Sequence, residues 1–307
     1  MKEIGIGLGT TATGELDALI QAFQAIETEG FQTAWIPNIF ELDAMTVAAL
    51  AGRETRTLEI GVAVVPTHSR HPLYMAQQAL STQAAARGRF VLGIGPSHAV
   101  VIENMLGLSY AKPARHVREY VTILNQLFTD GKADFQGETY RVGAGLQVKI
   151  EKPPPVLIGA LGPRMVEIAG SLTDGTITWM TGPRTLGERI VPGLRKAAEA
   201  AGRPPPRTVA GLPIAVTSDP AAARESASKI FGLYGGLPSY RAMLDNEGVN
   251  DPGDLTIAGD ERAVEDAIRS LVSAGVTDFN AAIFPVGDDP APGMKRTREL
   301  LAGLARN

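Results

Sequence analysis

The sequence predicts an α/β fold, a (β/α)₈ TIM barrel that forms a single domain over residues 1–307. Eight short runs rich in β-forming residues alternate along the chain with segments whose apolar residues recur at helical spacing. Most of the runs are continuously apolar, which is typical of parallel strands covered on both faces. Eight strand-helix units favour a closed barrel over the alternative, an open doubly wound sheet divided into two domains.

Local patterns predict the individual elements. The predicted strands are residues 3–9, 33–37, 58–65, 89–95, 155–161, 175–180, 208–216 and 278–285. Helical spacing is clearest in three groups: Leu16, Leu19, Ile20, Phe23 and Ile26; Leu186, Ile190, Leu194 and Ala197; and Val264, Ala267, Ile268 and Leu271. The glycines placed to end helices in the left-handed conformation are Gly30, Gly88, Gly202 and Gly275.

Two connections are longer than a plain strand-helix unit, which takes roughly 25 to 30 residues. They follow strands four and seven. The first contains a helix-like stretch at 115–128 and then two short β-like runs around Gly137, which predict a hairpin. The second contains a helix-like segment and a loop rich in Gly, Asn and Asp. Insertions after barrel strands lie at the catalytic face, so we expect both to wall or cover a pocket.

Composition excludes several classes of protein. The formal net charge is −4 with no dense basic run, so nucleic acid is not an expected partner. There is no cysteine, which excludes disulfides and zinc-thiolate sites, and no metal site is predicted. No apolar run approaches the ~20 residues of a membrane span. The sequence therefore predicts a cytoplasmic protein that binds no membrane.

The stretch "GVAVVPTHSRHP" ends the third predicted strand in a polar cluster. In a barrel, residues just past a strand line the catalytic mouth, which favours contact with a ligand. The alternative for Arg70 and His71 is that they tie loops together and cap the helix that begins near Pro72.

The fourth predicted strand ends in "LGIGPSHAVVIE". Gly93 and Gly95 permit close approach of a ligand or another backbone, and Ser97 offers a hydroxyl. His98 titrates near neutrality and is the leading candidate for proton transfer; the alternative is an ordinary loop histidine.

The fifth predicted strand leads directly into the start of a helix at "GALGPRM". Free backbone N–H groups at such a start bind a phosphate well, and an arginine there adds charge or is simply solvated. The residues of this candidate phosphate site are Gly159, Ala160, Leu161, Gly162, Pro163 and Arg164. Trp179, at the end of strand six, presents a flat face to a ring ligand or forms part of the wall.

Taken together, "GVAVVPTHSRHP", "ALSTQAAARGRFVLGIGPSH", "GALGPRMVEIAGSLTDGTITWM" and "SAGVTDF" resemble the luciferase-like monooxygenase superfamily, in particular its branch that uses the deazaflavin coenzyme F420. The similarity covers nearly the whole chain. It implies a bacterial-luciferase-like barrel that binds the coenzyme ring at the carboxyl ends of its strands, and a homodimer by analogy.

The resemblance also implies roles for particular residues. A non-prolyl cis peptide behind the ring falls at Ala63-Val64, the coenzyme phosphate at Gly159 to Gly162, and Asn38, Ser97 and His98 beside the ring. The chain departs from its sugar-phosphate and alcohol dehydrogenase relatives, which have an Asp-His pair where this sequence has Asn38 and Ile39. Their activities are therefore not carried over.

The predicted function is hydride transfer between F420 and a small organic substrate, with His98 or water supplying the proton. The leading alternative is an FMN-dependent monooxygenase. More distant alternatives are a non-catalytic flavin-binding protein and a non-redox barrel lyase or isomerase. The last would require a Schiff-base lysine at a strand end, whereas Lys149 and Lys152 precede strand five.

Overall fold

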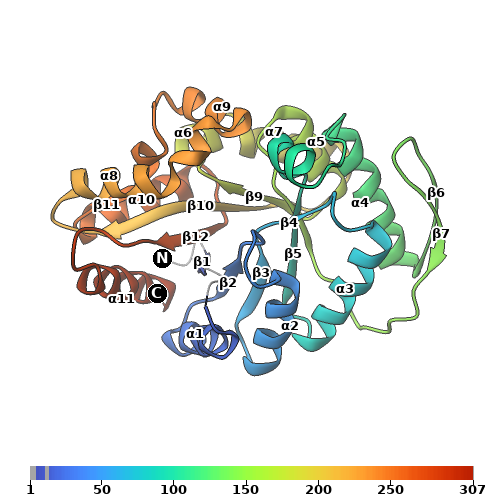
Figure 1. Ribbon diagram of the computed structural model, residues 1–307, viewed down its shortest axis with the longest axis horizontal. Helices are drawn as coiled ribbons and strands as arrows, with labels where there is room; N and C mark the ends of the chain where they lie inside the picture. Colours follow the sequence, from blue (N-terminus) through green and yellow to red (C-terminus); the bar gives the residue numbers. More distant parts are fainter. Residues whose placement is uncertain (1–4, 11–13, 307) are drawn as a thin grey trace.

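The computed structural model describes residues 5–10 and 14–306, and these form a closed parallel barrel surrounded by helices (Figure 1). Hydrogen bonding runs from each strand to the next, and the last strand pairs with the first, which closes the barrel. The barrel strands are β1 (Gly5–Gly9), β2 (Thr33–Ile36), β3 (Glu59–Val62), β5 (Phe90–Gly95), β8 (Val156–Ile158), β9 (Gly175–Trp179), β10 (Arg207–Val216) and β12 (Asp278–Ile283). The predicted barrel is confirmed, with residues 3 and 4 of the first predicted strand outside the described residues.

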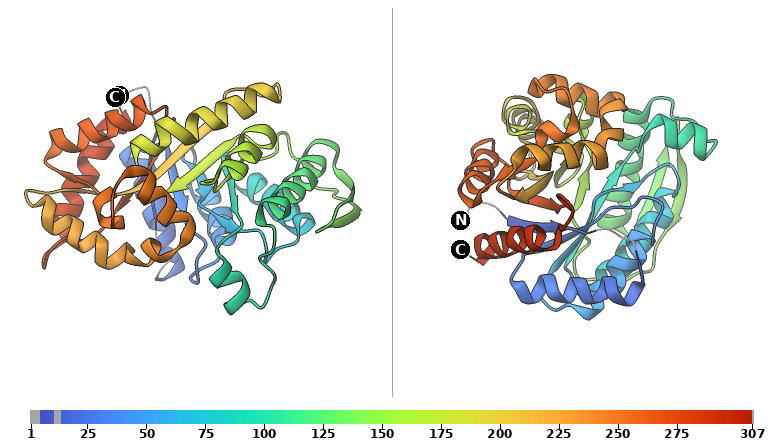
Figure 2. Two further views of the ribbon diagram at one scale, coloured as in Figure 1. Left: turned by 90° about the horizontal axis from the view of Figure 1, so that it is seen from above. Right: turned by 60° about the vertical axis from the view of Figure 1, so that its left-hand side comes forward.

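Helices cover the outside of the barrel in both views of Figure 2. Apolar faces such as that of Leu19, Phe23 and Ile26 are buried against the strands, which is why amphipathic spacing predicted these elements. The longer helices are α1 (Leu16–Glu29), α2 (Ala44–Glu54), α3 (Pro72–Ala85), α4 (Pro113–Asp130), α5 (Pro163–Leu172), α7 (Val191–Ala200), α8 (Pro220–Phe231), α9 (Pro238–Glu247), α10 (Glu261–Ser273) and α11 (Ala291–Arg306). The four glycines predicted to end helices all have φ between 65° and 90°.

The insertion after the fourth barrel strand contains the predicted helix and hairpin. A π-helical turn, η1 (Val100–Met105), precedes α4, and the hairpin is β6 (Lys132–Gln136) with β7 (Arg141–Gly145). The Glu119 carboxylate on α4 accepts hydrogen bonds of 2.8 to 3.0 Å from three backbone N–H groups of the hairpin turn. Figure 1 shows the hairpin at the edge of the molecule, outside α4. The expectation that this whole insertion covers a pocket is therefore wrong for the hairpin.

The insertion after the seventh barrel strand is built from short elements. It contains α8, η3 (Gly232–Gly236), α9, η4 (Pro252–Leu255), a short strand β11 (Ile257–Gly259) and α10. The strand β11 extends the sheet beside the end of β10. The Glu247 carboxylate at the end of α9 accepts hydrogen bonds from the Arg184 and Thr185 N–H groups, at 3.1 and 2.8 Å. This fastens α9 to the short helix α6 (Pro183–Thr185), which follows β9.

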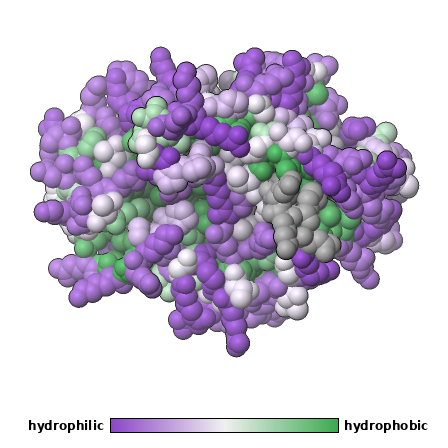
Figure 3. Space-filling view, turned by 180° about the vertical axis from the view of Figure 1, so that it is seen from behind, coloured by the Kyte–Doolittle hydropathy of each residue, from purple (hydrophilic) through white to green (hydrophobic). Residues whose placement is uncertain are grey.

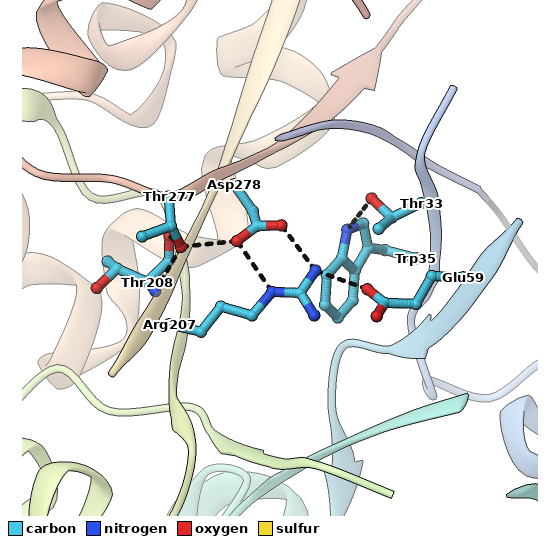
Figure 4. Close-up of polar contacts among 7 residues, drawn as sticks. All are labelled: Thr33, Trp35, Glu59, Arg207, Thr208, Thr277 and Asp278. Carbon is cyan, nitrogen blue, oxygen red and sulfur yellow. Dashed lines mark hydrogen bonds and ion pairs between the residues drawn. The ribbon is translucent and has the colours of Figure 1, made fainter. Parts of the chain in front are cut away.

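A charged network closes the amino-terminal end of the barrel interior (Figure 4). The Arg207 guanidinium donates to both Asp278 carboxylate oxygens, at 2.9 and 2.6 Å, and to Glu59 at 2.6 Å. The same guanidinium lies 5.5 Å from the centre of the Trp35 ring. A Cβ atom on Gly61 would stand 2.3 Å from that ring, so only glycine leaves room for the tryptophan.

One face of the molecule is shown in Figure 3, where hydrophilic residues dominate and hydrophobic residues show between them in a few places. Across the residues that the structure describes, no helix combines the length and apolar character needed to cross a membrane.

Candidate functional site

Val64, which follows β3, lies against the ends of the two neighbouring barrel strands β5 and β8. A Cβ atom placed on Gly95, at the end of β5, would stand 2.8 Å from Val64 Cγ2, and one on Gly159, after β8, would stand 3.6 Å from it. The backbone N–H of Gly159 also donates to the Ile94 carbonyl at 2.8 Å. The Val64 side chain thus packs over the two glycines, and the three residues form a floor at the carboxyl end of the barrel.

The backbone at these strand ends is irregular. The Ala63-Val64 peptide bond is cis, as the resemblance implied, and it separates β3 from the two-residue strand β4 (Val65–Pro66). Ser97 and Met180 have φ of 61° and 50°, in the left-handed region that non-glycine residues rarely adopt. Such conformations cluster at functional sites, where surrounding contacts hold them in place. Here the Tyr110 hydroxyl donates to the Ser97 carbonyl at 2.8 Å.

The start of α5 provides the predicted anion site. Gly162 is the N-cap residue, Pro163 is the first helical residue, and no side chain caps the helix. The backbone N–H groups of the first turn, such as that of Arg164, therefore have no side-chain acceptor. Gly162 and Arg164 are exposed, whereas Ala160 is fully buried and Leu161 is half-buried. Ala160 is thus a core residue, and the exposed part of this site begins after it.

Arg70 and His71 take the structural roles of the alternative interpretation. Arg70 forms an ion pair with Asp43, and its backbone carbonyl accepts from the Tyr120 hydroxyl at 3.0 Å. His71 is the N-cap of α3, where its Nδ1 atom accepts from the Leu73 N–H at 3.3 Å. We therefore assign neither Arg70 nor His71 to the ligand site.

Asn38 is half-buried after β2, and its Oδ1 atom accepts from the Ala44 N–H at 3.1 Å. This hydrogen bond fastens the loop after β2 to the start of α2. Ile39 and Phe40, which follow Asn38, are 57% and 70% exposed. The loop after β2 therefore exposes two large apolar side chains beside Asn38.

His98 lies half-buried just beyond Ser97, and burial lowers the pKa of its imidazole below 6.5. The ring is therefore mainly neutral at pH 7. A neutral imidazole donates from one ring nitrogen and accepts at the other. His98 can thus hold a proton close to the strand ends and exchange it with a bound molecule.

A continuous row of rings runs beside His98, and sequence reasoning missed most of it. The distances between neighbouring ring centres are 5.5 Å from His98 to Tyr240, 4.9 Å from Tyr240 to Tyr234, 6.0 Å from Tyr234 to Trp179, 5.5 Å from Trp179 to Phe231 and 6.0 Å from Phe231 to Phe284. We call these six residues the aromatic row. The row joins the exits of β5, β9 and β12 through the strand-seven insertion.

A second group of rings supports the end of β5 from behind. The His68 and His116 rings stack with centres 3.8 Å apart and planes 6° apart. The Thr67 hydroxyl bonds the Gly95 carbonyl at 3.2 Å, so the His116 Nε2–H donates to Thr67 at 2.9 Å. His116 is 6% exposed, and burial lowers its pKa to about 4. The neutral His116 ring therefore belongs to a hydrogen-bonded chain that ends on Gly95.

Asn280 is a further polar residue that the sequence reasoning missed. It is 8% exposed inside the barrel, its Oδ1 atom has no hydrogen-bond partner among the described residues, and a Cβ atom on Gly9 would stand 3.0 Å from that atom. The available signal was one polar residue, Asn280, within the otherwise apolar run "FNAAIF". Cavities of about 310 and 280 Å³ lie elsewhere, and neither is lined by Val64, Gly95 or His98.

Comparison with known proteins agrees with this architecture. Residues 3–278 match the model of the luciferase-like monooxygenase family. The 5,10-methylenetetrahydromethanopterin reductase of Archaeoglobus fulgidus is 30% identical over 89% of this chain and 83% of its own. The F420-dependent glucose-6-phosphate dehydrogenase of Kineococcus radiotolerans is 29% identical over the same shares of the two chains.

A solved structure shows the same fold over almost the full length. The coenzyme F420 dependent tetrahydromethanopterin reductase from Methanopyrus kandleri superposes with a TM-score of 0.83 at 23% identity, covering 98% of this chain and 97% of that one. The family match spans most of the chain. The chain belongs to the luciferase-like monooxygenase family.

Proposed function

We propose that this protein is an F420-dependent oxidoreductase that transfers hydride between the deazaflavin ring and a small organic substrate. One observation carries the proposal: Gly95 and Gly159 end two adjoining strands without side chains, and the Val64 side chain packs over both. A planar ring would rest on this floor, and a Cβ atom on Gly95 would displace the Val64 side chain from it. Relatives named for F420, as a reductase and a dehydrogenase, support the choice of coenzyme over FMN.

Different residues of this chain would bind the phosphate and the ring of the coenzyme. The N–H groups at the start of α5 and the Arg164 side chain would bind the coenzyme phosphate, because partial positive charge gathers at a helix N-terminus. Asn38, Ala63, Val64, Gly95 and Ser97 would hold the ring. When bound, the coenzyme supplies a carbon that gives or accepts hydride. Holding both reactants at a fixed distance and angle would provide much of the rate.

His98 is the residue we assign to proton transfer. Its neutral ring can donate a proton from one ring nitrogen to the substrate and regain it from solvent. Trp179 belongs to the wall and contacts Phe231 and Tyr234 rather than standing free. We further propose that the protein acts as a homodimer in the cytoplasm, by analogy with relatives.

The proposal is tested by titrating the purified protein with F420 and with FMN while following the fluorescence of each coenzyme. We expect F420 to bind more tightly. Tighter binding of FMN would overturn the assignment in favour of a flavin monooxygenase, and no binding of either would remove the coenzyme site.

A further inference from the structure

Apart from His98, the aromatic row at the strand exits has no ligand-binding role in the proposed function. Three of its residues, His98, Trp179 and Phe284, follow or end barrel strands. The rings of the strand-seven insertion, such as Tyr240 and Phe231, lie between them. Five of the six rings are half-buried, so each keeps part of its surface open. Such rings bind flat, apolar molecules by stacking and edge contacts.

The charges around the row disfavour an anionic ligand. The cationic residues nearest to the row in sequence are ion-paired: Lys229 with Glu225, Arg241 with Asp245, and Arg184 with Glu188. Residues 90–111 and 276–294, which contain His98 and Phe284, have no Lys or Arg. A carboxylate or phosphate placed against the row would therefore lose water and find these three neighbouring cations already paired.

The row also offers hydrogen-bond donors suited to a neutral oxygen. The Tyr110 and Tyr120 hydroxyls donate to backbone carbonyls, whereas the Tyr240 hydroxyl has no hydrogen-bond partner within the described residues. Burial and the neighbouring Tyr234 raise the pKa of Tyr240, so its hydroxyl stays protonated at neutral pH. Next to it stands the neutral His98 ring, 5.5 Å away between centres. Both a phenol hydroxyl and a neutral imidazole N–H can donate a hydrogen bond to a carbonyl oxygen.

We propose that the aromatic row is the substrate wall of this site and that the substrate is a neutral, planar, conjugated carbonyl compound. The proposal rests on the proposed function and names its substrate class. Tyr240 is then a specificity-determining residue that donates a hydrogen bond to the carbonyl oxygen. The rings of Trp179 and Tyr234 cover the flat apolar part of the molecule.

The test compares two probes of the same shape and different charge, 1,4-naphthoquinone and 1,4-naphthoquinone-2-sulfonate. Both are titrated by calorimetry into protein saturated with oxidised F420, so that no hydride is transferred. The chain has no cysteine, so quinone addition to a thiol does not interfere. We expect the neutral quinone to bind at least about tenfold more tightly, because burying an unpaired charge costs at least that much.

Variants locate the site of binding. Tyr240→Phe keeps the ring and removes the hydroxyl, and we expect it to weaken quinone binding about fivefold while the F420 affinity stays unchanged. Tyr74→Phe is the matched control, because Tyr74 is 66% exposed on α3, away from the row. Equal or tighter binding of the sulfonate would overturn the substrate class. Unchanged quinone affinity in Tyr240→Phe would overturn the assignment of Tyr240.

The two proposals fail in different ways. Loss of F420 binding would contradict the proposed function, and the quinones are then compared on coenzyme-free protein. We expect the neutral quinone to bind more tightly than the sulfonate to the coenzyme-free protein too, because the aromatic row consists of residues of the protein and does not include the coenzyme. A reversed order in the coenzyme-free protein would contradict the substrate wall independently of the coenzyme.

Discussion

Val64 occupies the space that a side chain on Gly95 would need, because a Cβ atom there would lie 2.8 Å from Val64 Cγ2. Gly95→Ala must therefore displace the Val64 side chain from the floor of the proposed ring site. We expect the F420 affinity to fall by about tenfold or more, with the fold retained, because a shift of about 1 Å in a binding surface has large effects. Fluorescence titration and circular dichroism measure the two properties.

Gly93→Ala provides the contrast to this variant. A Cβ atom on Gly93 would stand 2.0 Å from the Val62 carbonyl oxygen, so the barrel backbone itself must move. We expect a loss of about 2 kcal/mol or more in the free energy of unfolding, measured with urea. If Gly95→Ala lowered the free energy of unfolding as much as Gly93→Ala, its loss of F420 affinity would come from a disturbed barrel and not from the displaced Val64 side chain.

Gly162→Glu tests the phosphate site. Gly162 has φ of −84° and no heavy atom within 4 Å of a Cβ position, so the fold accepts a side chain there. A carboxylate beside the start of α5 would repel the coenzyme phosphate, and we expect F420 binding to be abolished. The control is Gly143→Glu on the outer hairpin, where a Cβ atom likewise meets nothing within 4 Å. Unchanged F420 affinity in Gly162→Glu would remove the phosphate site.

His98→Asn tests proton transfer. General acid catalysis by a positioned side chain contributes about 10²- to 10⁴-fold, so we expect kcat to fall by about 10²-fold with the F420 affinity unchanged. Oxidation of reduced F420 by 1,4-naphthoquinone is the assay. His71→Asn is the matched control, because asparagine also caps a helix and His71 is the N-cap of α3. Full activity of His98→Asn would assign the proton to water.

His116 makes stability depend on pH. Its pKa in the folded protein is about 4, against 6.5 when unperturbed, so the unfolded chain binds more protons between these values. The contribution of the neutral ring is complete above pH 6.5 and decreases as the pH falls towards 4. We expect the free energy of unfolding to fall over that range, and His116→Gln to show a shallower dependence. Urea unfolding at several pH values measures both, and identical slopes would contradict the assignment.

Arg207→Met tests the charged network inside the barrel. The substitution leaves Asp278 and Glu59 near each other without their shared cation. Breaking a buried pair by removing one partner costs about 3 kcal/mol, and we expect a loss of that size in the free energy of unfolding. Urea denaturation is the measurement. A change below about 1 kcal/mol would show that solvent screens this network.

The sequence predicted the elements that depend on neighbouring residues. Alternation of apolar runs and helical spacing located all eight barrel strands, and Gly137 marked the hairpin, because turns and helix ends depend on local backbone conformation. The predicted strand at 58–65 is interrupted after Val62, and the cis Ala63-Val64 bond lies in the interruption. No local sequence pattern predicts this interruption of the strand.

Contacts between distant parts of the chain could not be predicted in the same way. Arg207 meets Glu59 across 148 positions of sequence, and Tyr240 meets His98 only because the strand-seven insertion folds back over the barrel. The family resemblance supplied the position of the cis bond, whereas composition and spacing did not.

Trp35 and Arg207 fill the barrel below the proposed ring site, so the lumen is plugged at one end. In the proposed function, both reactants would therefore enter and leave at the carboxyl ends of the barrel strands. A molecule resting against the outer wall would block the exit of one seated deeper. With the proposed ring site below the proposed substrate wall, the coenzyme would bind first and leave last in each turnover.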